Sequence, residues 1–250
     1  MSRRLSSTGA ERLSLYYRRL ASFSDPEAFI SSEELAEAIS HSAAQVRRDL
    51  SCFGTFGTPG RGYRVGELRN RLERAMGKVR SQNVILVGAG NLGMALLSYK
   101  GFRHHRYEIV AAFDSDLRKI GKRLEGLEIQ DLQTLRPVVA STGAKMAIVS
   151  VPAGEAQRTI DRLISAGIHA ILNFAPIQAV VPESVKLLNV DLSVEMDRLC
   201  YLMRGQHPWD DEEAESVETV LFDETPSEDG QSASRTSSGR SQAISSFPDL

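Results

Sequence analysis

Glycine residues at fixed spacing near the middle of the chain point to phosphate chemistry. The stretch that carries them is Gly88, Ala89, Gly90, Asn91, Leu92 and Gly93. It follows an apolar run directly and opens a segment with helical spacing. Such glycines permit a tight turn, a close approach of the backbone to a pyrophosphate and close packing of helix on strand. Because a helix N-terminus favours negative charge, the stretch indicates a dinucleotide site.

A carboxylate stands where the same chemistry needs one. Asp114 ends the next apolar run, 21 residues after Gly93. A carboxylate at this place can accept hydrogen bonds from both ribose hydroxyls of NAD. Ser115 and Asp116 follow it, rather than an arginine that would favour the 2′-phosphate of NADP. We therefore expect NAD or NADH as the cofactor; the alternative is that Asp114 only caps the following helix.

Short apolar runs alternate with helical segments from residue 83 onward. The expected strands are 83–87, 108–113, 146–151 and 170–174, with helices near 91–100, 155–166 and 191–204. This pattern is typical of a parallel sheet covered by helices on both faces. The sequence therefore predicts a doubly wound α/β (Rossmann) domain over residues 81–190.

The ends of the later strands suggest the rest of a ligand pocket. Ligands of this fold bind beyond the carboxyl ends of the strands. Val151 and Pro152 follow one predicted strand, and Asn173, Phe174 and Pro176 follow another. We expect these residues to wall a nicotinamide pocket; equally, the prolines could simply end the strands.

The sequence contains no recognisable motif for catalysis or metal binding. None of the five histidines stands with a carboxylate in a recognisable acid–base arrangement. Cys52 and Cys200 lack the paired spacing of a zinc site or a disulfide framework. We expect no metal and no catalysis. The alternatives are an NAD-dependent oxidoreductase with an appended DNA-binding domain, and a nucleotide-binding scaffold that holds a protein partner.

Residues 1–80 predict a winged-helix DNA-binding domain. Capping boxes at Ser31 and Ser42 begin two short helices, which joined by a short turn form a helix-turn-helix. Aromatic residues alternate with glycines over 53–63 and predict a tight hairpin, with its turn at 58–60. The residues expected to contact DNA are Ser42, Gln45, Arg47, Arg48, Arg61 and Tyr63.

Charge is distributed unevenly along the 250 residues, although the net charge is only −2. Residues 1–80 hold 14 Lys and Arg against 9 Asp and Glu, a net charge of +5. A positive region of this kind suits DNA, because cations release the counterions of the phosphates. Residues 205–250 hold 2 against 11, a net charge of −9, and predict an acidic disordered tail. Without an apolar run of membrane length or a secretory signal, the expected location is the cytoplasm, with no membrane partner.

Taken together, these residues resemble the Rex family of redox-sensing transcriptional repressors. The matching stretches cover about residues 10–205, in the order of the family. They are Arg12-Leu13 with Tyr16, Tyr17 and Arg18; 45–51; 53–54 through 62–63; 88–93 with Tyr99; 113–114; 171–176; and 190–192.

The resemblance implies a homodimer whose last helix, at 191–204, exchanges into the Rossmann domain of the partner. Proteins of this kind bind pseudo-palindromic operator DNA and release it when NADH replaces NAD. The resemblance also implies a switch in which Asp191 pairs with Arg18 in the DNA-binding state and with Tyr99 in the NADH state. Leu192 is then expected near the nicotinamide.

Overall fold

The computed structural model describes residues 5–54 and 56–204. One compact unit ends at Leu192, and a second begins at Ser193. The described part of the second unit belongs to the helix α9 (Leu192–Arg204). The tail that the sequence predicts to be disordered, residues 205–250, lies outside the described residues.

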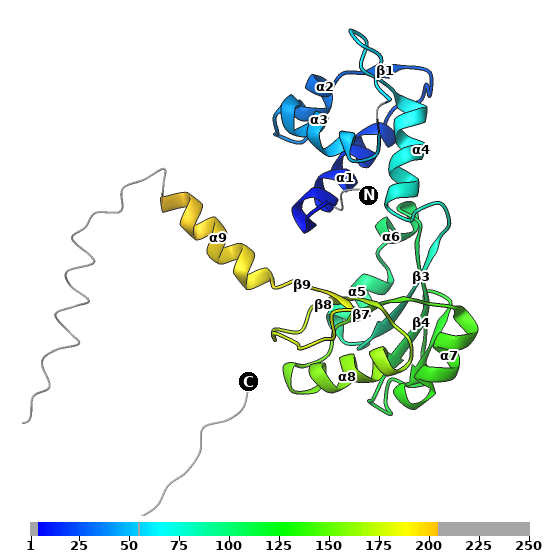
Figure 1. Cartoon of the computed structure of the whole chain (residues 1–250). Coiled ribbons are helices and arrows are strands. Elements are labelled where there is room, and N and C mark those ends of the chain that lie inside the picture. The colour runs from blue at the N-terminus through cyan, green and yellow to red at the C-terminus, as the bar shows by residue number, and fades with distance from the viewer. Residues whose placement is uncertain (1–4, 55, 205–250) are drawn as a thin grey trace, which may run out of the picture. The chain divides into compact units, whose positions relative to one another are not determined.

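The first part of the chain folds into a helical domain with a two-stranded antiparallel sheet (Figure 1). Its elements are α1 (Ser7–Ala21), β1 (Phe29–Ile30), α2 (Ser32–Glu37), α3 (Ala43–Ser51), β2 (Tyr63–Arg64) and α4 (Val65–Ala75). Leu13, Tyr16 and Leu20 recur at helical spacing on α1 and share a buried cluster with Leu50 and Leu68. One core therefore joins α1, α3 and α4, and the predicted winged-helix class is confirmed.

The predicted helix caps are formed, with one difference at α3. Ser31 and Glu34 make the reciprocal capping box of α2. The Ser42 hydroxyl accepts the backbone N–H of Gln45, but the Gln45 side chain donates to Asp49 instead of returning to Ser42. The predicted capping box at Ser42 is therefore wrong in one of its two hydrogen bonds. The Gln45 side chain does not bond to the backbone of Ser42, because the buried carboxylate of Asp49 is the stronger acceptor.

The segment predicted as a tight hairpin closes only at its tip. The backbone N–H of Thr58 donates to the carbonyl of Gly62 at 2.7 Å, around Pro59 and Gly60. The strand that leaves this turn, β2, pairs with β1 rather than with the described residues before the turn. A wing is present, but its partner strand precedes α2 in the chain. Local turn signals could not reveal this pairing, because its two strands are far apart in sequence.

Residues from 82 onward build a doubly wound sheet. Its strands are β3 (Gln82–Val87), β4 (Tyr107–Asp114), β5 (Arg123–Leu124), β6 (Leu127–Asp131), β7 (Met146–Val149), β8 (Ala170–Asn173) and β9 (Lys186–Asn189). Within the described residues the order is β5-β6-β4-β3-β7-β8-β9, and every neighbouring pair except β5 with β6 is parallel. The order reverses between β3 and β7, where folds of this class bind ligands. The predicted Rossmann class is confirmed.

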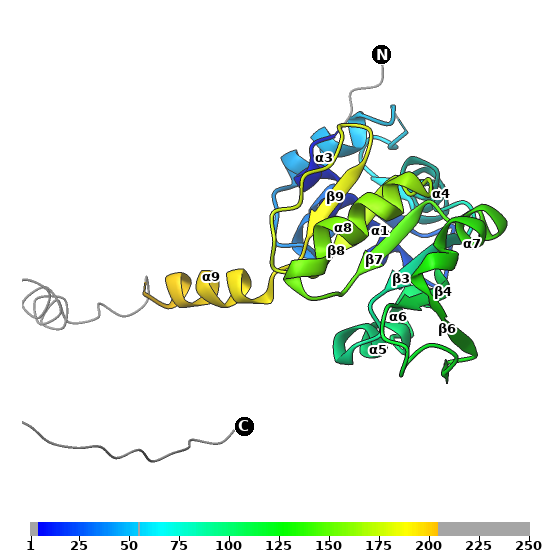
Figure 2. The same cartoon turned by 90° about the horizontal axis from the view of Figure 1, so that it is seen from below.

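Helices cover both faces of this sheet. They are α5 (Asn91–Leu97), α6 (Gly101–His104), α7 (Leu135–Thr142) and α8 (Ala153–Ser165), with the short 3-10 turn η1 (Leu132–Thr134). Ile85 and Val87 of β3 face a core shared with α7 and α8, whereas Val84 and Leu86 face a core that α5 and α6 complete. Figure 2 shows α8 beside β7 and β8. An unbroken apolar strand fills two cores because alternate residues point to opposite faces.

The sequence did not predict three of these strands. β5, β6 and β9 are short and mix polar with apolar residues. They lie at or next to the two ends of the described sheet, where burial is less complete and an unbroken apolar run is not needed. The predicted helix near 91–100 ends at Leu97, as α5, and a separate short helix that was not predicted, α6, begins at Gly101.

Candidate nucleotide site and DNA-binding surface

The glycine-rich turn between β3 and α5 has little room for side chains at two of its positions. A Cβ on Gly93 would overlap the carbonyl oxygen of Gly88, and a Cβ on Gly88, whose φ is +99°, would overlap the carbonyl oxygen of Ser150. The Ser150 hydroxyl donates to the Gly88 carbonyl at 2.8 Å and ties the end of β7 to the turn. Gly90 differs, since a Cβ there meets nothing within 4 Å. Gly90 therefore leaves an open approach to the backbone.

Asp114, at the end of β4, faces the same turn. Its Oδ2 accepts the backbone N–H of Ala89 at 2.8 Å and the ammonium of Lys119 at 3.0 Å. Its Oδ1 accepts the backbone N–H of Asp116 at 2.8 Å. Burial by itself would raise the pKa of Asp114, but these hydrogen bonds outweigh it and lower the pKa below its usual value. The group is therefore a carboxylate at neutral pH, as an acceptor for ribose hydroxyls must be.

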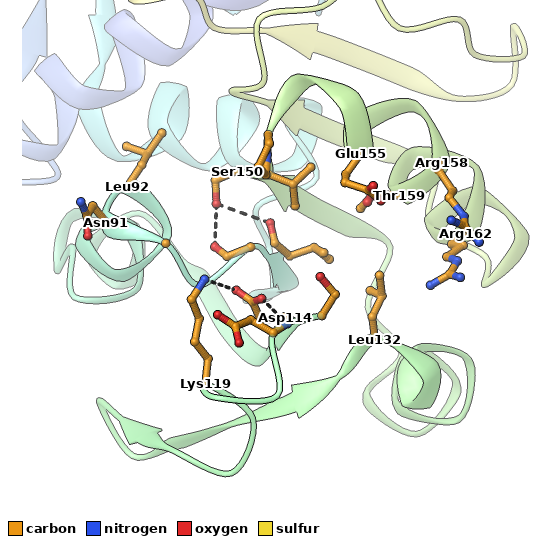
Figure 3. A pocket seen from close by; sticks show the side chains of 17 residues that line it. Asn91, Leu92, Asp114, Lys119, Leu132, Ser150, Glu155, Arg158, Thr159 and Arg162 are labelled. Carbon is orange, nitrogen blue, oxygen red and sulfur yellow. Dashed lines mark hydrogen bonds and ion pairs between the residues drawn. The ribbon is translucent and has the colours of Figure 1, made fainter. Parts of the chain in front are cut away.

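A cavity of about 660 Å³ opens at the carboxyl ends of β3, β4 and β7 (Figure 3). This volume lies within the range typical of small-molecule sites, roughly 300–1,000 Å³. The predicted cofactor residues that line it are Gly88, Gly90, Asn91, Leu92, Asp114, Val151 and Pro152. Ala89 and Gly93 support it from the turn. The structure thus gathers into one cavity residues that are up to 64 positions apart in the sequence.

The remaining predicted cofactor residues do not line this cavity: Asn173, Phe174, Pro176 and Leu192. The Asn173 amide donates to the Ala175 carbonyl at 3.0 Å and to Asn189 at 2.9 Å, and its oxygen accepts the Ala175 N–H at 3.1 Å. Asn173 thereby fixes the turn after β8. The ring of Phe174 packs against the core that the sheet shares with α5 and α6. Contact of these residues with a nicotinamide stays a prediction.

Several residues that line the cavity were not predicted from the sequence. They are Lys119, Leu132, Ser150, Glu155, Arg158, Thr159 and Arg162, together with Val87, Ser115 and Asp116. Four of these residues recur at helical spacing and lie on one side of α8: Glu155, Arg158, Thr159 and Arg162 (Figure 3). That spacing, directly after a strand end, was the sequence signal that could have identified them.

The second helix of the helix-turn-helix, α3, is anchored by a buried ion pair. Arg12 of α1 donates from Nε and Nη2 to Asp49 at 2.6 and 2.8 Å. The hydroxyl of Tyr16 and the amide of Gln45 also donate to Asp49, at 3.0 and 2.8 Å. Burial would raise the pKa of Asp49, but the hydrogen bonds from Arg12, Gln45 and Tyr16 lower it overall. Asp49 therefore stays charged and fixes the orientation of α3.

The residues that we expected to contact DNA on α3 have different surroundings. Ser42 caps the helix, and Gln45 is engaged by Asp49. Arg47 donates to Glu33 of α2 at 3.0 Å. Arg48 is exposed, and its guanidinium has no hydrogen-bond or ion-pair partner within the described part of the chain.

The wing lies beside α3. A groove of about 520 Å³ is lined by Arg47 and Ser51 of α3 and by residues 56–63 of the wing. The guanidinium of Arg61 lies 4.3 Å from the ring centre of Phe29, and the ring of Tyr63 lies 5.5 Å from that of Phe56. The aromatic contacts hold the wing, and Arg61 keeps a positive charge near its tip. DNA contact by the predicted residues stays a prediction.

The three residues of the predicted switch come from separate elements. Arg18 is an exposed residue of α1, and its charge adds to burial in lowering the pKa of Lys78. Tyr99 follows α5, is 59% exposed and meets the ring of Phe102 edge-on at 5.2 Å. Asp191 lies between β9 and α9. Their exchange of partners stays a prediction.

Neither a metal site nor a membrane span is found in the part of the chain that the structure describes. No group of three or more His, Cys, Asp or Glu among those residues is placed to hold a metal ion. No described helix is long and apolar enough to cross a bilayer. Cys52 and Cys200 are both free thiols.

Comparison with known proteins finds matches for both halves of the chain. Residues 79–177 match the family described as "CoA binding domain", and residues 4–51 match the family described as "Putative DNA-binding protein N-terminus". Over 191 residues the chain is 44% identical to the "Redox-sensing transcriptional repressor Rex" of Desulfitobacterium hafniense. That match covers 76% of this chain and 91% of the relative.

Two similar solved structures show a Rex-family repressor called RSP with its ligands. The complex of RSP with β-NAD+ and operator DNA has a TM-score of 0.76 and 34% identity, covering 88% of this chain and 99% of that one. The complex of RSP with β-NADH has a TM-score of 0.70 and 34% identity, covering 86% of this chain and 98% of that one. The likeness therefore spans both the helical domain and the sheet domain.

Proposed function

The chain belongs to the Rex family of redox-sensing transcriptional repressors, and on that premise we propose that it binds operator DNA as a homodimer and releases it when NADH binds. One observation carries the proposal. A cavity lined by the glycine-rich turn and the carboxylate of Asp114, and a groove beside α3 lined by Arg47 and Arg61 together with Glu33, occur in the same chain. Because operator DNA is the ligand, the protein acts in the cytoplasm.

Each part of the cavity supports NAD(H) as the cofactor. The N-terminus of α5 and the open backbone at Gly90 suit the pyrophosphate. The charged Asp114 suits the two ribose hydroxyls and repels a phosphate at the 2′ position. The nicotinamide half then extends past Leu92 and Pro152, toward the ends of the later strands, where Asn173, Phe174 and Pro176 are its expected neighbours.

The homodimer is supported by the apolar side chains of α9. Leu192, Val194, Met196, Leu199, Leu202 and Met203 are each 53–66% exposed. Exposed apolar surface on this scale marks an interaction site. An exchange of α9 between two chains covers these side chains and brings Leu192 to the nicotinamide of the partner. Two copies also supply two recognition helices, as a pseudo-palindromic operator requires.

An oxidoreductase with an appended DNA-binding domain is the competing function. Catalysis of hydride transfer from an alcohol needs a positioned acid or base. Among the described residues that line the cavity there is no histidine, Lys119 is engaged with Asp114, and Glu155 is the carboxylate without a described side-chain partner, while the relatives are named as repressors. We therefore favour a sensor without turnover. Oxidation of any alcohol or reduction of any aldehyde at the expense of the nucleotide would support the enzyme instead.

The test is a binding titration that follows the DNA and the nucleotide together. Fluorescence anisotropy of a labelled pseudo-palindromic, A·T-rich duplex is measured with the full chain at fixed salt, then with NADH or NAD added. NADH is expected to release the duplex, and NAD is not. If neither nucleotide changes a sequence-specific complex, the repressor does not sense redox state through this cavity. If binding is lost at moderate salt without sequence preference, the chain is instead a scaffold for another partner.

A further inference from the structure

The carboxylate of Asp114 has little accepting capacity left for a ligand. Each carboxylate oxygen offers about two acceptor positions. On Oδ2 these are filled by the Ala89 N–H at 2.8 Å and the Lys119 ammonium at 3.0 Å. On Oδ1 the Asp116 N–H, at 2.8 Å, fills one. A single position therefore remains, on Oδ1.

A ribose brings two adjacent hydroxyls, so one of the three present donors must give way. The N–H of Ala89 belongs to the glycine-rich turn, and the N–H of Asp116 closes a turn with Asp114 itself. Neither backbone group can withdraw without breaking its turn. Lys119 is different, because its ammonium sits on a flexible four-carbon stem and its side chain is 34% exposed. A nucleotide whose two ribose hydroxyls both bind Asp114 would therefore displace the ammonium of Lys119.

The displaced ammonium stays at the ribose end of the cavity. Lys119 lines the cavity beside Asp114 (Figure 3). The nearby carboxylate of Asp116 already pairs with Arg118 at 2.9 Å, which together with the N–H of Arg118 lowers the pKa of Asp116 to about 2. Lys119 thus lies close to the ribose hydroxyls. Once displaced from Asp114, it could pair there with the 2′-phosphate of NADPH.

We propose that Lys119 determines the specificity of the ribose subsite, by competing with the ribose hydroxyls for Asp114 and by attracting a 2′-phosphate. This inference rests on the proposed binding of NAD(H). Lys119 weakens the binding of NADH, because the ligand must break its bond to Asp114. It strengthens the binding of NADPH, because its charge partly offsets the repulsion between Asp114 and the phosphate. Lys119 does not discriminate NADH from NAD, whose adenosine halves are identical.

The test compares Lys119→Met with Lys122→Met in the full chain. Lys122 is exposed on the same loop and does not line the cavity, so its variant removes the same charge from nearly the same place. Dissociation constants for NADH, NAD and NADPH are measured by calorimetry at fixed salt. Lys119→Met is expected to tighten NADH about 1.4- to 5-fold, the range for losing a partly exposed ion pair. It should also weaken NADPH, while Lys122→Met matches the wild type.

The decisive quantity is the ratio of the NADPH and NADH dissociation constants. A ratio that rises in Lys119→Met alone, with the NADH to NAD ratio unchanged, supports the proposal. A ratio that stays the same, or that changes equally in both variants, overturns the role of Lys119 but leaves NADH binding intact. If the wild type binds neither NADH nor NAD, both the proposed function and this inference fail.

Discussion

Asp49 shows how one buried charge positions the helix that is expected to read DNA. Its side chain is 2% exposed and accepts four hydrogen bonds, two of them from Arg12. Replacing Asp49 by Asn removes the charge and leaves the guanidinium of Arg12, 13% exposed, without its partner. We expect a loss of about 2–4 kcal/mol in the free energy of unfolding, measured by urea denaturation.

The pH dependence of that loss follows from the direction of the pKa shift. The pKa of Asp49 is lowered from its usual 3.8 in the folded protein, so its contribution is complete well above pH 3.8 and fades as the pH falls through the lower folded value. The difference between wild type and Asp49→Asn should shrink in that acidic range. The control is Glu33→Gln, which removes the charge of an exposed carboxylate that pairs with Arg47 and accepts from Ser32, and it should cost less than Asp49→Asn. Equal costs for both variants would contradict the role of Asp49.

A substitution at Gly90 can block ligand binding without disturbing the fold. A side chain at Gly90 meets open space in the cavity, whereas one at Gly93 would collide with the backbone of Gly88. Gly90→Leu should abolish the binding of NADH and leave DNA binding and the unfolding midpoint close to wild type. The control is Gly154→Leu, which also meets open space but does not line the cavity. NADH-dependent release of DNA by Gly90→Leu would mean that the nucleotide binds elsewhere.

Arg48 provides the corresponding test on the DNA side. Its guanidinium is exposed on α3 without a partner among the described residues, so it is available to a base edge. Arg48→Ala should lower operator affinity by about 1–3 kcal/mol and relax discrimination between operator and random DNA. Arg123→Ala removes the same charge from the edge strand β5 and should change neither. An Arg48→Ala variant with unchanged discrimination would refute base reading by this residue.

At the scale of elements, α9 carries the largest group of exposed apolar side chains among the described residues. Leu199→Glu together with Leu202→Glu places two charges among its exposed apolar side chains. If α9 forms the dimer interface, sedimentation should show a monomer with weakened operator binding, because a charge buried at an interface is costly. Asp197→Lys, an exposed polar position of the same helix, should remain a dimer. A dimer that survives the double change must use another surface.

At the scale of the whole molecule, function requires that the two ligands influence each other. If NADH lowers the affinity for DNA, then DNA must lower the affinity for NADH by the same factor. Asp191→Ala should reduce this factor more than it reduces either binding constant alone, because the predicted exchange between Arg18 and Tyr99 is lost. Anisotropy titrations with and without NADH measure all three quantities. A variant with weaker DNA binding but an unchanged coupling factor would assign Asp191 to stability alone.

The sequence by itself determined the features that depend on neighbouring residues. The glycine spacing located the turn between β3 and α5, and unbroken apolar runs identified the central strands, because buried parallel strands need apolar residues on both faces. Helical spacing with Ser31 and Ser42 as caps located α2 and α3. Each of these signals arises from interactions between residues that are close together in the sequence.

The tertiary structure decided everything that depends on residues brought together from afar. It paired β1 with β2, bonded Arg12 to Asp49, and placed the carboxylate of Asp114 on the backbone N–H of Ala89. It also brought one side of α8 to the cavity and bonded Asn173 to Asn189 of β9. None of these contacts follows from spacing, because each depends on which segments meet once the cores are packed.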